Sequence, residues 1–155
     1  KTDSGKIKNI KHKGSYWAPW LVGMPAEEGN CMLQIMSSGL LDKYPNLKLC
    51  IAHGSGSYPC LHGRIQHGVR CKVEWVWTVV DNYFEGRKKE RNDTVDMYVK
   101  KNFYADSMTH NLDTLQRIIK LYGSDKIIFG TDYPFPLGEV HPYYKPGEII
   151  QKLGD

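Results

Sequence analysis

The chain has 155 residues, of which 41% are hydrophobic and 25% are charged, a usage typical of one globular domain with a core. Its 21 Lys and Arg against 17 Asp and Glu give a net charge of +4, too small and too scattered an excess to predict a nucleic-acid partner. No run approaches the roughly 20 apolar residues that span a bilayer and nothing resembles a signal peptide, so the sequence predicts a cytosolic protein without a membrane partner.

The first part of the chain predicts an irregular stretch followed by an amphipathic helix. Residues 1–15 are polar and basic and favour a surface loop. Residues 16–25 combine aromatics with prolines, which is typical of a rigid irregular segment that belongs to a core, an interface or the wall of a ligand pocket. Over residues 26–42 the apolar side chains recur at helical spacing, after Glu27 and Glu28 in the first turn, where a helix dipole favours acids.

Three short apolar runs predict strands, and each run ends on a polar side chain. The first run carries no alternation, the pattern of a strand buried on both faces of a parallel sheet. It opens into a glycine-rich turn in which Gly54 and Gly56 let the backbone bend sharply. The runs cover residues 47–53, 102–106 and 126–132, and they end in order on His53, Asp106 and Asp132.

Helical patterns separate these strands. Residues 59–69 and 112–122 show apolar stripes at helical spacing, and Gly123 suits the C-cap of the second helix. Residues 73–84 favour a buried helix or a lid, and residues 146–153 favour the start of one more helix. Strands that alternate with helices predict an α/β fold with a parallel sheet. In a (β/α) barrel of this kind the C-terminal strand ends converge on one mouth, where the chemistry takes place.

The four cysteines show no C-x-x-C spacing, and two of them fall inside apolar runs. We therefore expect buried free thiols of a reducing compartment rather than disulfides or a zinc knuckle. The residues concerned are Cys31, Cys50, Cys60 and Cys71.

The side chains at the strand tips suit catalysis. Histidine and aspartate at neighbouring tips favour a divalent metal that lowers the pKa of a bound water, or a base that takes a proton from that water. Arg64, on the helix behind His53, suits a planar carboxylate. The structural alternative is that these residues cap helices and form turns, and Asp106 beside Ser107 fits that role best.

Four stretches of the sequence resemble the second half of the aminocarboxymuconate-semialdehyde decarboxylase family of the amidohydrolase superfamily. They are PWLVGMPAE (19–27), AHGSGSYPCLHGRIQHG (52–68), NFYADSMTH (102–110) and GTDYPFPLGE (130–139). The resemblance implies a zinc-dependent, non-oxidative decarboxylase of 2-amino-3-carboxymuconate 6-semialdehyde. Such an enzyme acts in the kynurenine pathway of tryptophan catabolism and limits the synthesis of quinolinate and NAD.

The resemblance also implies roles for individual residues. Asp132 would be a ligand of Zn²⁺, and His53 the base that activates the water bound to it. Arg64 would bind a carboxylate of the small-molecule substrate in the site of the neighbouring subunit, which implies a homodimer. An apolar wall beside the substrate would be formed by Trp20, Phe135 and Leu137.

The sequence also departs from the family. The family's His-x-His pair and its His-Pro-Trp histidine are missing, and His12 lies in surroundings that do not match either. A barrel needs about 250 residues and eight strands. We therefore expect residues 1–155 to be the C-terminal part of a (β/α)8 TIM barrel, about strands six to eight without the N-terminal half, and inactive alone. The alternatives are another amidohydrolase-family hydrolase or decarboxylase, or a non-catalytic short product that pairs with a full-length subunit.

Overall fold

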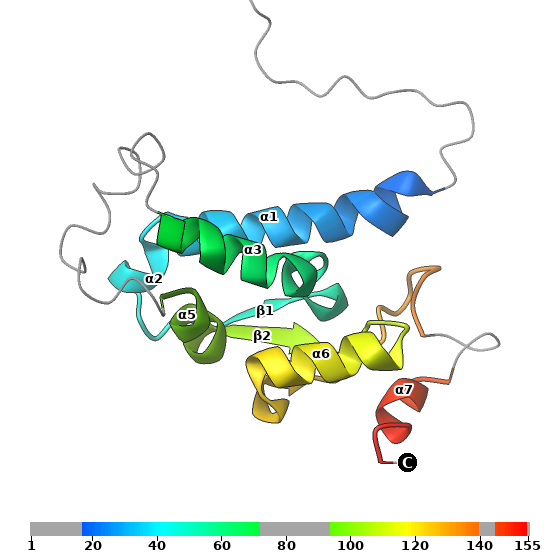
Figure 1. Cartoon of the computed structure of the whole chain (residues 1–155). Helices are drawn as coiled ribbons and strands as arrows, with labels where there is room; N and C mark the ends of the chain where they lie inside the picture. Colours follow the sequence, from blue (N-terminus) through cyan, green and yellow to red (C-terminus); the bar gives the residue numbers. More distant parts are fainter. Residues whose placement is uncertain (1–16, 72–93, 140–144, 155) are drawn as a thin grey trace, which may run out of the picture.

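The computed structural model describes residues 17–71, 94–139 and 145–154. The predictions for residues 1–15 and 73–84 lie outside these ranges, as does the side chain of Cys71. Figure 1 shows helices packed against a short sheet. In chain order the described elements are η1 (Pro19–Gly23), α1 (Met24–Ser37), α2 (Leu40–Lys43), β1 (Leu49–Ile51), η2 (His53–Ser55), α3 (Tyr58–Cys71), α5 (Thr94–Asn102), β2 (Phe103–Asp106), α6 (Leu112–Tyr122), η4 (Ser124–Lys126), β3 (Ile127–Ile128) and α7 (Glu148–Gln151).

The three strands form one parallel sheet in the order β1-β2-β3. Leu49 pairs with Phe103, and Ala105 pairs with Ile127. Each strand lies inside the range that the sequence predicted, and the parallel α/β arrangement is confirmed. Because all three strands point the same way, the residues that follow their C-terminal ends gather at one edge of the sheet.

The helices cover one face of the sheet. α1 packs on α3, α3 on α6, and α6 on both β2 and β3 (Figure 1). In β2 the side chains of Phe103 and Ala105 are buried under these helices, whereas Tyr104 between them is only half-buried. The largest fully buried side chains of this core come from four helices and β2, and include Met32, Tyr58, Val99, Phe103, Leu115 and Ile118.

The other face of the sheet is uncovered by the described residues. Cys50 pairs with Tyr104 and Asp106 with Ile128, so these side chains share that face, where Cys50 and Ile128 are exposed. The prediction that the first strand is buried on both faces is therefore wrong, because the described helices lie on one side of the sheet and Cys50 is exposed on the other.

The cysteine prediction is half right. Cys31, Cys50 and Cys60 are free thiols, as expected, but all three are exposed rather than buried. Cys31 and Cys60 belong to α1 and α3, on surfaces turned away from the core, and Cys50 lies on the uncovered face of the sheet.

Residues 16–25 were predicted to be irregular, and this prediction is also wrong. The chain is helical from Pro19, through the π-helical turn η1 and directly into α1. Pro19 stands in the first turn of η1, where the backbone N–H has no intrahelical partner and a proline is tolerated, and Pro25 lies where η1 passes into α1. The predicted helix over residues 26–42 is present as α1 and α2, with a break at Ser38 and Gly39.

The second half of the chain follows the prediction more closely. α6 spans the predicted residues 112–122, and Gly123 follows it with a φ of 101°. α7 lies within the predicted range 146–153. The sequence interpretation missed α5, which packs on β2 and α6. Within the described ranges, the helices are all too short or too polar to cross a membrane.

Candidate functional site

His53 stands where β1 ends and the backbone turns over. Its φ is 51°, and the next two residues, Gly54 and Ser55, have φ angles of 60° and 71°. A hydrogen bond of 2.8 Å from the Ser55 N–H to the Ala52 carbonyl closes this turn. Non-glycine residues are uncommon in the left-handed region, and such conformations concentrate at functional sites. Asp132, with a φ of 54°, is a second case, so both predicted catalytic residues share this unusual backbone geometry.

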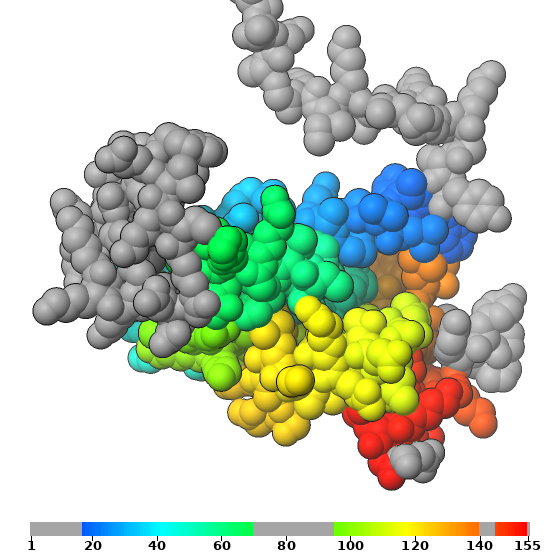
Figure 2. All heavy atoms as spheres, in the orientation of Figure 1, coloured from blue at the N-terminus to red at the C-terminus, as the bar shows by residue number. Residues whose placement is uncertain are grey.

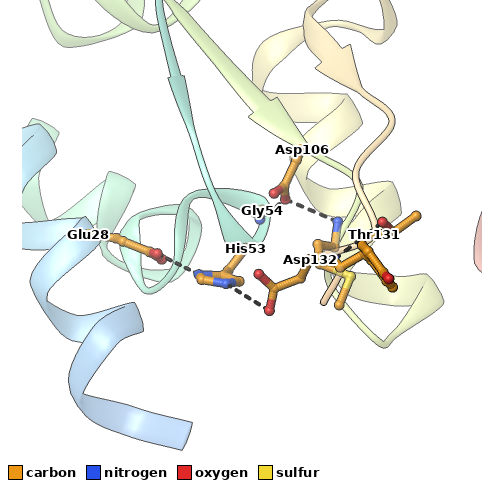
Figure 3. Close-up of polar contacts among 8 residues, drawn as sticks. Glu28, His53, Gly54, Asp106, Thr131 and Asp132 are labelled. Atoms are coloured by element: carbon orange, nitrogen blue, oxygen red, sulfur yellow. Dashed lines mark hydrogen bonds and ion pairs between the residues drawn. The ribbon is translucent and has the colours of Figure 1, made fainter. Parts of the chain in front are cut away.

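The His53 ring lies between two carboxylates from different parts of the chain (Figure 3). Its Nδ1 is 2.5 Å from Oε1 of Glu28, which is on α1. Its Nε2 is 3.7 Å from Oδ2 of Asp132, which follows β3. The three side chains are between 18% and 24% exposed, so the cluster sits in a partly buried, partly open position. The sequence prediction that His53 and Asp132 meet at one edge of the parallel sheet is confirmed.

The backbone around Asp132 is held by hydrogen bonds of its own loop. The Phe135 N–H donates to the Asp132 carbonyl at 2.9 Å, and the Glu139 N–H donates to the Thr131 carbonyl at 2.8 Å. Glu139 is buried, and its carboxylate accepts a hydrogen bond of 2.7 Å from the Gly147 N–H, at the start of α7. The loop that carries Asp132 is therefore fixed at both ends.

Asp106, the third polar residue at a strand end, has a structural role. Its Oδ1 accepts hydrogen bonds from the backbone N–H of Gly54 at 2.8 Å and of Met108 at 3.1 Å. One bond caps the segment that follows β2, as the structural alternative expected, and the other ties this segment to the turn after His53. Asp106 thus holds the His53 turn in place (Figure 3).

The surrounding carboxylates raise the pKa of His53 from 6.5 to about 9. The main cause is the hydrogen bond to Glu28. Burial opposes it, and the negative charges of Glu28, Asp132 and Asp106 add to it. The imidazole in this cluster therefore keeps its proton to a higher pH than a free histidine does.

The structure places Arg64 away from this cluster. It lies on α3 with an exposed side chain and makes no hydrogen bond or ion pair with His53, Glu28 or Asp132. It is therefore not brought into the site of its own chain.

The predicted apolar wall lies at the same end of the molecule as His53. Trp20 is 45% exposed in η1 and meets the Trp17 ring edge-on, with 5.5 Å between ring centroids. Phe135 is 59% exposed and Leu137 is half-buried, both in the loop after Asp132. Figure 2 shows η1 in blue and this loop in orange at one end of the molecule.

The described residues do not hold a metal ion by themselves. Across residues 17–71, 94–139 and 145–154, His, Cys, Asp and Glu form no group of three or more with the geometry of a metal site. The carboxylate of Asp132 lies beside Nε2 of His53, and the Nδ1 atom of His53 is already bonded to Glu28. Among the described residues, Asp132 is therefore the carboxylate beside His53 that this position can offer to a metal.

Comparison with known protein families matches residues 8–153 to the model described as "Amidohydrolase". The chain belongs to the amidohydrolase family. Among curated members, 138 residues are 39% identical to the 2-amino-3-carboxymuconate-6-semialdehyde decarboxylase of Dictyostelium discoideum. This match covers 89% of the chain but 34% of that enzyme, so the chain spans about a third of the length of its relative.

Two solved structures share the fold of the chain. The apo structure of Metarhizium anisopliae IDCase covers 80% of the chain and 30% of its own length, with 27% identity and a TM-score of 0.65. The 5-carboxyvanillate decarboxylase of Novosphingobium aromaticivorans, complexed with manganese and 4-hydroxy-3-methoxy-5-nitrobenzoic acid, covers 79% of the chain and 34% of its own length. Its identity is 21% and its TM-score 0.60, which is a likeness of fold.

Sequence reasoning missed Glu28 as a member of this cluster. It interpreted the residue as a first-turn acid that suits the helix dipole. A signal was present, since Glu28 is followed at i+4 and i+8 by the buried Met32 and Met36, which places its carboxylate on the inward stripe of α1. An acid on a buried stripe needs a partner, and here the partner is His53.

Proposed function

We propose that this chain forms one side of the active site of a metal-dependent, non-oxidative decarboxylase. The observation that carries the proposal is the His53 ring set between Glu28 and Asp132 at the C-terminal edge of a parallel sheet. Active sites of (β/α)8 enzymes lie at this edge. The similarity to the Dictyostelium discoideum decarboxylase supports the same reaction class.

In the proposed complete protein, β1, β2 and β3 are strands six to eight of a (β/α)8 barrel, and residues 1–155 are its C-terminal part. The uncovered face of the sheet supports this arrangement. It carries Cys50, Tyr104 and Ile128, and in a closed barrel that face would line the packed interior. The missing strands would come from residues outside this chain.

Asp132 is proposed as one ligand of a divalent cation, Zn²⁺ by the family resemblance. A catalytic zinc takes about three protein ligands, so the others would come from the N-terminal part of the complete protein. The manganese in the 5-carboxyvanillate decarboxylase supports a divalent cation in this fold. When bound, such a cation supplies positive charge that stabilises negative charge developing on the substrate.

His53 is proposed as the proton carrier. Decarboxylation breaks the bond between a carbon and its carboxylate, carbon dioxide leaves, and the remaining carbon takes up a proton. The Nε2 atom of His53 faces the Asp132 side of the site, where it can take a proton from water and return it. A base must be neutral, and a cation on Asp132 would favour that form, because it offsets one of the negative charges that raise the pKa of His53.

The substrate is proposed to be 2-amino-3-carboxymuconate 6-semialdehyde, as part of tryptophan breakdown in the cytosol. Trp20, Phe135 and Leu137 would form the apolar wall beside it. Arg64 would bind one of its carboxylates in the neighbouring subunit of a homodimer. The exposed position of Arg64 on α3, without a contact to its own His53, supports an action in trans.

The test uses the complete coding sequence that contains this chain, expressed with Zn²⁺. The proposal predicts loss of the near-ultraviolet absorbance of the semialdehyde and release of carbon dioxide. His53→Ala should abolish turnover, whereas His67→Ala, an exposed histidine on α3, should not. Turnover of 5-carboxyvanillate with none of the semialdehyde would overturn the substrate proposal. If neither compound is turned over, the proposal that the complete protein is a decarboxylase is overturned.

A further inference from the structure

The His53 ring contacts a residue, Glu28, that is not one of the polar residues at the strand ends. Glu28 comes from α1, 25 positions before His53, and its Oε1 lies 2.5 Å from Nδ1 of the imidazole. The opposite ring nitrogen, Nε2, lies on the Asp132 side. A histidine whose Nδ1–H is held by an acceptor has its ring direction fixed, and its Nε2 is presented to whatever lies across from it.

The backbones of α1 and of the turn after His53 lie close together. The Ser57 N–H donates to the Pro25 carbonyl at 2.9 Å, which joins the start of α1 to the turn. Gly56 has a φ of 55°, and a Cβ atom there would lie 2.4 Å from the Pro25 oxygen and 2.5 Å from Oε2 of Glu28. Only glycine therefore lets α1 come near enough for the Glu28 carboxylate to reach the ring.

The local packing does not fully satisfy Glu28. Its Oε2 atom is buried and has no hydrogen-bond partner among the described residues. A buried oxygen without a partner is unfavourable for folding, because it has lost its hydrogen bonds to water. The only hydrogen bond that the described residues give this carboxylate is the one to His53, so its position is explained by the histidine rather than by α1.

We propose that Glu28 is a positioning residue that accepts the Nδ1 proton of His53 and thereby holds Nε2 toward Asp132. In this role Glu28 acts through the ring of His53, which is its hydrogen-bond partner among the described residues. Its effect on catalysis rests on the proposed function, but its effect on the ring does not.

The first test reads the ring directly. The complete protein is labelled with ¹⁵N in its histidine side chains, and the His53 resonances are assigned with His53→Gln. In the wild type the Nδ1 proton of His53 should be retained, slow to exchange and shifted downfield by its carboxylate partner. Glu28→Gln keeps the shape and an acceptor oxygen but loses the charge, so this proton should move upfield. In Glu28→Ala it should exchange rapidly and disappear.

The matched control is Glu27→Gln, because Glu27 is the neighbouring acid on α1 and is exposed. It should leave the His53 resonances unchanged. Backbone amide spectra report whether each variant is folded, and Glu28→Gln, which is isosteric, decides the outcome if Glu28→Ala does not fold. A folded Glu28→Gln variant whose His53 Nδ1 proton stays at the wild-type position would overturn the proposal.

The second test separates this proposal from the proposed function. In a decarboxylase, Glu28→Gln should lower kcat by about 10- to 100-fold with little change in KM, as is usual when the partner of a site histidine is removed. Glu27→Gln should keep wild-type kcat. If the complete protein has no decarboxylase activity but Glu28 still controls the His53 resonances, the proposed function fails and the positioning role stands.

Discussion

Replacing Glu28 by glutamine should flatten the pH dependence of stability between about pH 6.5 and 9. The folded-state pKa of His53 is raised to about 9, chiefly by Glu28, and an unfolded histidine titrates near 6.5. The folded protein therefore binds more protons than the unfolded chain in this range. The stabilisation is complete below pH 6.5 and is lost as the pH rises through 9.

The size of the effect follows from the pKa change and from the exposure of the pair. At 1.36 kcal/mol per pKa unit, a rise from 6.5 to about 9 corresponds to at most about 3.4 kcal/mol. Water screens the pair, because the side chains of His53 and Glu28 are 24% and 18% exposed. We therefore expect about 1–2 kcal/mol.

The assay is urea unfolding of the chelator-treated protein at pH 6, 7.5 and 9.5, read by circular dichroism. The wild type should lose about 1–2 kcal/mol more than Glu28→Gln between the lowest and highest pH. Glu27→Gln should follow the wild type. Parallel curves for the wild type and Glu28→Gln would refute the assignment of the raised pKa to this contact.

Three further outcomes are expected. Gly56→Ala should destabilise the fold by about 2 kcal/mol or more, because alanine is strained at a φ of 55° and its Cβ would meet the Pro25 oxygen. Gly63→Ala, which adds a methyl group in open space within α3, should stabilise the fold by about 0.5–1 kcal/mol. Similar effects of the two variants in urea unfolding would count against the close approach of α1 to the turn after His53. Asp106→Ala removes the acceptor of two backbone hydrogen bonds and should lower the free energy of unfolding by about 1–3 kcal/mol. Asp106→Asn keeps an acceptor oxygen and should lower the free energy of unfolding by less. The opposite order would contradict the structural role of this carboxylate. The 155-residue chain alone should show no turnover and should bind zinc only weakly. Tight stoichiometric binding of zinc in equilibrium dialysis would show that the chain itself supplies the remaining ligands.

The strands and their polar ends could be predicted because the signal is local. Each strand is an apolar run that stops at a polar residue, and parallel strands bring such residues to one edge, which joins His53 to Asp132. α6 could also be predicted from the sequence, since Leu115, Ile118 and Tyr122 form one buried stripe and Gly123 ends the helix. These features need no knowledge of what the segments pack against.

The features that sequence reasoning missed depend on contacts between distant segments. The partnership of Glu28 with His53 joins residues 25 positions apart, and nothing in either motif specifies it. The exposure of Cys50 depends on what covers the second face of the sheet, which an apolar run cannot reveal. No helix was predicted at α5, although Val95, Tyr98 and Val99 have helical spacing and are buried, because the helix has only nine residues and follows the polar residues 85–93.

Asp132 and His53 are proposed to belong to one metal-dependent site that residues outside this chain complete. The most direct measurement is anomalous X-ray diffraction from crystals of the complete, zinc-loaded protein. We expect an anomalous peak about 2.0–2.2 Å from a carboxylate oxygen of Asp132, with the Nε2 atom of His53 facing it. A peak bound by other residues and far from Asp132 would rule out this site.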